Sequence, residues 1–166
     1  MAQLWVDKFR PQSFDKMELH VSLNKRLQKL AESGDLPHLM FYGPPGAGKR
    51  TRILALLREL FGSPVDKVKV QQKTYQFEEP TKITVEMTIL YSNHHIELTP
   101  VDAGLRDHLV VQSVVKEMAA SVPITDTGKR SFKIILLNEV DRLSKNAQHA
   151  LVRFLNYFFW VNFFLI

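Results

Sequence analysis

The sequence predicts an α/β fold in which a mainly parallel sheet carries helices on both faces. Three observations indicate this class. Strand-like and helix-like patterns alternate along the chain. Residues 132–137 are apolar at nearly every position, which is typical of a strand buried on both faces. A glycine-rich turn joins a short apolar run to a helical pattern near residue 48. The 166 residues, 45% hydrophobic and 23% charged, therefore suit one globular domain.

The first third of the chain is expected to form two helices separated by a strand. Apolar residues at helical spacing begin after Ser22, the expected N-terminal cap, and end before Gly34. The apolar run 38–42 predicts a short strand. The next helix spans residues 48–61 and ends at Gly62, because glycine and the proline that follows it stop a helix.

An antiparallel hairpin is predicted after this helix. Apolar and polar residues alternate from residue 68 and again over 83–89, and 78–81 supply the turn between them. Residues 95–98 predict a further short strand. A helix is expected over about 105–120.

The last part of the chain predicts a loop, a buried strand, a helix and a tail. The loop covers 125–131 and the strand 132–137, and Ser144 caps the last helix. We divide the chain into a nucleotide-binding domain, 1–151, and a divergent apolar tail, 152–166. Charged and amide residues interrupt this tail, and a bilayer needs about 20 apolar residues, so no membrane partner is expected.

The turn near residue 48 has the spacing of a phosphate-binding loop. Glycines leave room for backbone N–H groups to converge on an anion, and the helix that follows adds unpaired amides. Lys49 brings a full positive charge to the outer phosphates. The residues predicted to bind a nucleotide, ATP or ADP, are Gly43, Pro44, Pro45, Gly46, Ala47, Gly48, Lys49, Arg50 and Thr51.

Arg50 departs from this motif. The residue after the lysine is normally Ser or Thr, whose hydroxyl binds Mg²⁺, whereas a guanidinium repels a cation. Thr51 comes one residue later, about 100° further round the helix, so we expect it to point elsewhere.

A second departure follows the strand 132–137. In phosphate-loop enzymes an Asp at this point holds Mg²⁺ and the next Glu activates water. Here Asn138 takes the place of the Asp, and Glu139 remains as a catalytic residue of a degenerate site. We therefore expect weak or absent Mg²⁺, no protein-bound metal and little or no hydrolysis, with residual turnover through Lys49 and Glu139 left open.

The composition limits the kinds of metal site, location and partner that we expect for this chain. The chain has no cysteine, which excludes disulfides and thiolate metal sites. Charged residues follow Met1 closely, so we expect no secretory signal and a location in the cytosol or nucleus. Residues 1–60 hold ten Lys and Arg against six Asp and Glu, a basic balance that permits contact with nucleic acid.

Several motifs together resemble the small subunits of replication factor C, the eukaryotic sliding-clamp loader. The similarity spans about residues 4–151. It is carried by the phosphate loop and by the segments Trp5–Pro11, Pro37–Leu39, Glu97–Gly104, Asn138–Ser144 and Ala147–Leu151.

The resemblance implies a P-loop NTPase of the AAA+ class within a five-subunit ring that places the sliding clamp on primer–template DNA in replication and repair. It implies a nuclear location. It also implies partners: the other replication factor C subunits, the clamp, and DNA reached through the assembled complex. The matching small subunit carries a basic residue after the lysine and binds nucleotide without driving hydrolysis, in agreement with Arg50. The helix at 105–120 would lie towards the clamp.

The chain departs from the family after Leu151. The family's Ser-Arg-Cys motif, helical lid and collar have no counterpart here, so we expect an incomplete AAA+ domain. In the AAA+ sheet a strand separates that of the phosphate loop from the one before Asn138, and we expect Phe163–Ile166 to take this place. Two alternatives stay open: a self-sufficient P-loop ATPase, and a non-functional truncated product.

Overall fold

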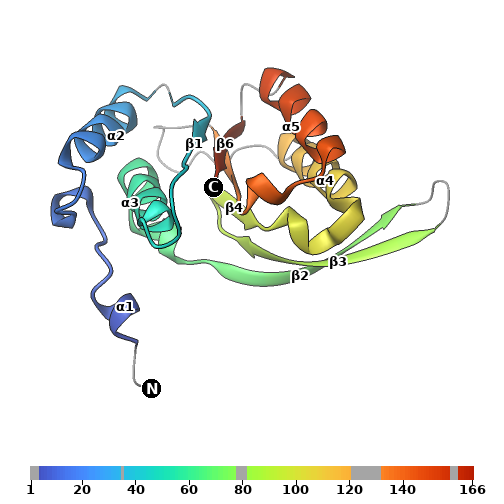
Figure 1. Cartoon of the computed structure of the whole chain (residues 1–166), viewed down its shortest axis with the longest axis horizontal. Helices are drawn as coiled ribbons and strands as arrows, with labels where there is room; N and C mark the ends of the chain where they lie inside the picture. The colour runs from blue at the N-terminus through green and yellow to red at the C-terminus, as the bar shows by residue number, and fades with distance from the viewer. Residues whose placement is uncertain (1–3, 35, 78–81, 121–131, 158–160) are drawn as a thin grey trace. The chain divides into compact units, whose positions relative to one another are not determined.

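The computed structural model describes residues 4–34, 36–77, 82–120, 132–157 and 161–166 (Figure 1). The chain divides into two compact units. The first comprises residues up to 36 together with 42–66, and the second comprises 37–41 together with 67–166. The predicted turn at 78–81 and the predicted loop at 125–131 lie outside the described residues.

The first unit is helical. It contains α1 (Trp5–Lys8), the 3₁₀ turn η1 (Phe14–Lys16), α2 (Val21–Ser33), α3 (Lys49–Phe61) and η2 (Ser63–Asp66). Helices α2 and α3 pack against each other. Gly34 ends α2 in the left-handed conformation, as expected for a C-terminal glycine.

The predicted cap of α2 is wrong by two residues. The helix begins at Val21, so Ser22 lies inside it, and His20 is the N-cap with φ of 58°. Asn24 explains the earlier start, because its side-chain amide donates to the carbonyls of Met17 and Leu19 and holds the turn before the helix. The sequence rule for caps does not include such a contact from within the helix.

The second unit contains a six-stranded sheet with the order β1-β6-β5-β4-β3-β2. Strands β1, β6, β5 and β4 pair in parallel. Strand β3 pairs antiparallel with β4, and β2 pairs antiparallel with β3. The predicted α/β sheet with an inserted hairpin is therefore confirmed. The strands are β1 (Leu39–Met40), β2 (Lys69–Phe77), β3 (Ile83–Tyr91), β4 (His95–Leu98), β5 (Lys133–Leu137) and β6 (Val161–Leu165).

Strand β6 takes the place expected for the tail. Leu39 and Met40 pair with Phe164 and Leu165, and β5 pairs along the other edge of β6. Phe164 is fully buried and its ring meets that of Phe41 edge to face at 6.1 Å. The predicted strand 38–42 is shorter than expected, because β1 meets only the last part of β6.

Two helices cover one face of this sheet, α4 (Asp107–Ala120) and α5 (Lys145–Tyr157) (Figure 1). Their apolar residues form one core with alternate residues of strands β2 to β6. Helices α2 and α3 belong to the other unit, so the expected covering of the second face stays a prediction. Helix α5 continues to Tyr157, past residue 152, where the sequence analysis placed the start of the tail.

The start of α4 corrects the predicted helix 105–120. A 3₁₀ segment, η3 (Pro100–Arg106), precedes α4 and contains Gly104 with φ of 59° and ψ of −131°. This conformation interrupts the helical path, so Leu105, expected on the apolar face, is 92% exposed. Apolar spacing alone does not detect such a break.

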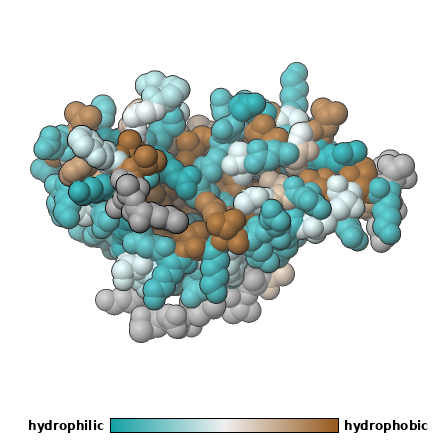
Figure 2. All heavy atoms as spheres, turned by 90° about the horizontal axis from the view of Figure 1, so that it is seen from below, coloured by the Kyte–Doolittle hydropathy of each residue, from teal (hydrophilic) through white to brown (hydrophobic). Residues whose placement is uncertain are grey.

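The surface seen from below is mainly hydrophilic, with hydrophobic residues scattered in small groups (Figure 2). Within the described parts of the chain, no helix is both long and apolar enough to cross a membrane.

Two buried ionisable groups in the sheet have shifted pKa values. Burial lowers the pKa of Lys133, and burial together with Glu117 raises the pKa of Tyr75 far above its ordinary value.

Candidate functional site

The phosphate loop, residues 43–48, lies in the first unit and leads directly into α3. Gly43, Gly46 and Gly48 have φ of 150°, 78° and 79°, conformations that strain any residue with a Cβ. A turn closes the loop, since the amide of Ala47 donates to the carbonyl of Pro44 at 3.3 Å. Residues 43–47 are exposed, so the loop is open to a ligand.

Lys49 folds back over this loop. Its Nζ donates to the carbonyl of Gly43 at 2.7 Å and to that of Pro44 at 3.1 Å. The ammonium group is thus held directly beside the loop, where a phosphate bound by the loop amides would meet it. The arrangement combines backbone donors with one full positive charge, which suits a di- or triphosphate.

The two residues after Lys49 have different surroundings. Arg50 is exposed in the first turn of α3. Thr51 is half-buried, and its Oγ1 accepts a hydrogen bond from Arg10 Nη1 at 3.2 Å. Arg10 is in turn paired with Asp7, at 3.2 Å. The first turn of α3 therefore presents a guanidinium and a hydroxyl already in use, neither of which favours Mg²⁺.

The second motif lies in the other unit, where β5 ends. The backbone amide of Asn138 donates to Leu98 of the neighbouring strand. The side-chain amide of Asn138 donates to Glu97 Oε1 at 2.9 Å. Glu97 is only 3% exposed and lies on β4. Asn138 is thus held by a buried carboxylate one strand away.

Glu139 has an uncommon backbone conformation, with φ of 55°. Non-glycine residues in this region are rare and are concentrated at functional sites. Its carboxylate is about half exposed and pairs with Arg142 at 2.6 Å. The side chain is therefore accessible from solvent.

The structure brings together the loop residues 43–51 in one unit and Asn138 with Glu139 in the other. The action of both motifs on one nucleotide stays a prediction.

Across the described ranges, no group of three or more His, Cys, Asp or Glu side chains is arranged to hold a metal. His95 is buried in β4 and its Nδ1 meets Ser92 Oγ at 2.7 Å, which gives this histidine a structural partner.

Three polar residues near these motifs were not predicted from the sequence. Arg52 and Asn24 are buried beside the phosphate loop, and Glu97 is buried beside Asn138. Each stands within an apolar pattern of a helix or strand, at a position that the periodicity assigns to the interior. A charged or amide residue at such a position is the signal that could have found them, since burial of these groups requires a partner.

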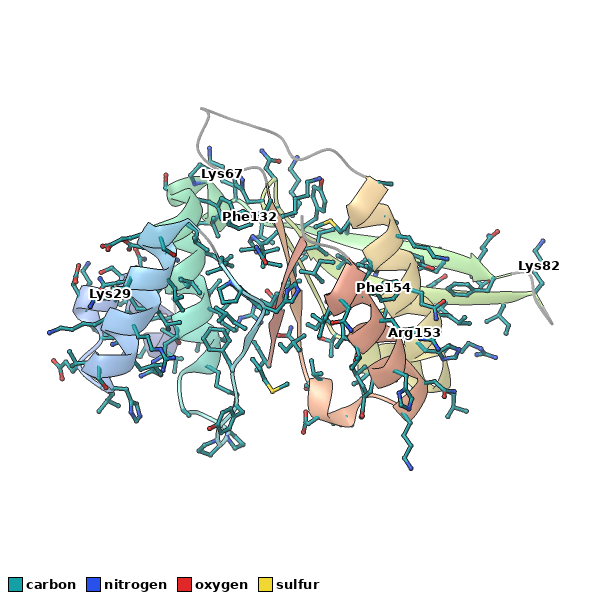
Figure 3. All side chains as sticks on the ribbon, turned by 90° about the horizontal axis from the view of Figure 1, so that it is seen from above. Lys29, Lys67, Lys82, Phe132, Arg153 and Phe154 are labelled. Carbon is teal, nitrogen blue, oxygen red and sulfur yellow. The ribbon has the colours of Figure 1, made fainter. Side chains whose placement is uncertain are left out.

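A groove between α4 and α5 is a separate feature of the second unit. It is lined by His108, Gln112, Asn146, His149, Ala150, Arg153 and Phe154. Figure 3 shows Arg153 and Phe154 on α5, beside α4. None of the predicted site residues lines this groove.

Comparison with known proteins reveals strong similarity to one group. No family model matches the chain. It is 49% identical to replication factor C subunit 5 of Oryza sativa subsp. japonica, 48% to replication factor C subunit 3 of Arabidopsis thaliana and 45% to replication factor C subunit 3 of Homo sapiens. Each similarity covers 90% of this chain and 42–43% of the relative, so the chain spans less than half the length of these proteins.

Proposed function

Because this chain is homologous over 90% of its length to replication factor C subunits 3 and 5, we propose that it is a small subunit of a clamp-loading complex in DNA replication. The observation that carries the proposal is this homology, which includes the phosphate loop and the segment around Asn138. The AAA+ resemblance and the mostly parallel sheet support it.

The proposed ligand is ATP or ADP, bound through Gly43–Thr51. Glycines with positive φ, an open loop and the Lys49 ammonium over its carbonyls fit a phosphate chain. Mg²⁺ fits poorly. Arg50 offers no oxygen ligand, Thr51 is engaged by Arg10, and Asn138 carries no charge where the motif has an Asp.

The nucleotide would accordingly have a structural role, with little or no hydrolysis. Loss of the metal removes a main source of charge stabilisation at the transferring phosphoryl group. The Glu139 side chain is accessible from solvent, but in this proposal no bound Mg²⁺ lies beside it. A self-sufficient P-loop ATPase is therefore the less favoured alternative, and a non-functional truncated product is the other.

The proposed partners are the other replication factor C subunits, the sliding clamp, and primer–template DNA contacted through the complex. A role in DNA repair and a nuclear location belong to the same proposal. The formal charge of +5 supports proximity to a polyanion.

Two measurements test the proposal. Co-purification of the tagged chain with the other replication factor C subunits of the same organism is expected, and its absence would favour the truncated product. Isothermal titration of ADP is expected to show binding that Lys49→Ala weakens by about tenfold or more, because a charged hydrogen-bond donor is removed. Lys29→Ala, on the exposed face of α2, is the matched control (Figure 3).

Steady-state ATP hydrolysis separates the leading proposal from the alternative enzyme. We expect turnover near background with Mg²⁺ present. Brisk Mg²⁺-dependent turnover by the isolated chain would contradict the proposed structural role of the nucleotide and support a self-sufficient ATPase.

A further inference from the structure

Arg52 is a buried cation beside the phosphate loop. Its side chain leaves the first turn of α3, and the residue is only 8% exposed. All three guanidinium nitrogens donate hydrogen bonds: Nε to Asn24 Oδ1 at 3.2 Å, Nη1 to the carbonyl of Ala47 at 2.9 Å, and Nη2 to the carbonyl of Leu19 at 3.0 Å. Arginine is rarely buried without such partners, so these bonds specify its position.

Asn24, which accepts the hydrogen bond from Arg52 Nε, is itself held in place. It is 3% exposed, and its Nδ2 donates to the carbonyls of Met17 and Leu19 at 3.2 and 3.3 Å. The amide group is therefore fixed in the orientation that presents its oxygen to Arg52. The two side chains join α3 to the turn before α2, where His20 has φ of 58°.

The contact to Ala47 acts on the loop backbone. In a trans peptide the carbonyl and the next N–H lie in one plane and point in opposite directions. A carbonyl of Ala47 held by Arg52 therefore directs the N–H of Gly48 away from the guanidinium. This amide belongs to the group that a phosphate-binding loop uses to hold its anion.

Gly48 also permits the close approach of Arg52. A Cβ at residue 48 would lie 3.2 Å from Arg52 Nη1, in addition to the strain of φ 79°. The glycine of the motif and the buried arginine thus form one local arrangement.

We propose that Arg52, oriented by Asn24, is a positioning residue of the phosphate loop. It fixes the peptide between Ala47 and Gly48 so that the Gly48 amide is presented to nucleotide phosphates before the ligand arrives. Arg52 acts through the backbone and does not contact the nucleotide. The inference rests on the proposed nucleotide binding and names a further part of the same site.

The first test compares Arg52→Met with Arg58→Met in the 166-residue chain. Arg58 is on the same helix, and its hydrogen bonds run to Asp66 and to the carbonyl of Gln12, both outside the loop, so its loss is a matched control. Titration with ADP at a temperature where both variants are folded is expected to show affinity reduced about tenfold or more for Arg52→Met and less than twofold for Arg58→Met. Equal affinities would overturn the proposal.

The second test is hydrogen exchange of the ligand-free chain. Amides of residues 46–48 are expected to exchange faster in Arg52→Met than in the wild type and in Arg58→Met. A purely structural role would lower the denaturation midpoint and leave loop exchange and ADP affinity unchanged. If Arg52→Met does not fold, the test uses Arg52→Lys instead. One ammonium group cannot reproduce the three hydrogen bonds of the planar guanidinium, so wild-type ADP affinity and wild-type loop exchange in Arg52→Lys would overturn the inference.

The two proposals fail in different ways. A wild-type chain that does not bind ADP contradicts the proposed nucleotide binding. Loop exchange in the Arg52 variants still reports whether this residue fixes the loop, because that measurement needs no ligand.

Discussion

At the residue scale, the Asn138–Glu97 contact explains how an amide suits the end of β5. Glu97 is buried, and Asn138 donates to its Oε1 at 2.9 Å. An Asp at residue 138 would place two carboxylates at this distance, and like charges so close cannot both ionise without a large cost. The same substitution that disfavours Mg²⁺ thus satisfies a buried carboxylate.

We predict that Asn138→Asp lowers the free energy of unfolding by about 1 to 3 kcal/mol, because the hydrogen bond to Glu97 is lost and a second carboxyl group is placed beside a buried one. Urea denaturation measures the change.

Asn156→Asp on the exposed part of α5 is the control and should change stability by less than about 0.5 kcal/mol. A cost for Asn138→Asp no larger than that for Asn156→Asp would show that the contact with Glu97 contributes little to stability.

At the element scale, Asp107 links the starts of two helices. It opens α4 and is 2% exposed. Its carboxylate accepts from the backbone amide and the hydroxyl of Ser144, both at 2.7 Å. Ser144 Oγ also accepts from the amide of Ala147 at 3.2 Å, which confirms Ser144 as the cap of α5.

Asp107→Ala is expected to lower the free energy of unfolding by about 2 to 4 kcal/mol, because it leaves two half-buried donors of Ser144 without their charged acceptor. Chemical denaturation followed by circular dichroism measures the change. Asp102→Ala, at an exposed position of η3, should cost less than about 0.5 kcal/mol. Similar values for both variants would contradict the linking role of Asp107.

Strand β6 makes the apolar tail part of the sheet. Phe164→Ala removes a fully buried ring that contacts Phe41. The expected loss of stability is about 3 to 5 kcal/mol, the usual cost of such a cavity. Denaturation of Phe164→Ala beside Val152→Ala, at a position 57% exposed, measures it.

A Phe164→Ala variant as stable as the wild type would show that residues 161–165 are not an integral strand. Limited proteolysis gives an independent readout. Removal of the tail without unfolding of the remaining chain would lead to the same conclusion.

At the scale of the whole molecule, the two units separate the predicted phosphate loop from the sheet and its two helices. The loop, Lys49, Arg52 and Asn24 all lie in the first unit. A ligand held by the loop therefore stabilises this unit directly.

We predict that ADP at 100 times its dissociation constant slows amide exchange mainly in the first unit. Saturation at this level contributes about 2.7 kcal/mol of stabilisation to the conformations that bind. Hydrogen exchange with mass spectrometry should show this in α3, with a smaller effect in α5. Equal protection in both helices would show that the two units open together, and no protection in either would contradict nucleotide binding.

The sequence alone predicted the alternation of strands and helices, the hairpin and the phosphate loop, and the resemblance to replication factor C implied the place of the tail strand. The first three predictions depend on local patterns: periodicity in the helices and strands, and the spacing of Gly43, Gly46 and Gly48, which have positive φ in the structure. The two departures at Arg50 and Asn138 were equally visible, since each is a chemical property of a single residue.

Only the tertiary structure revealed the partners of the buried polar groups. Arg52 meets Asn24 across 28 residues and Asn138 meets Glu97 across 41, and no local pattern specifies which distant side chain will satisfy a buried donor. The start of α2 was also decided by a side-chain contact, because Asn24 holds the turn before the helix. Local chemistry thus determined which groups the chain offers, and packing decided which of them meet, because buried hydrogen bonds form between segments that folding brings together.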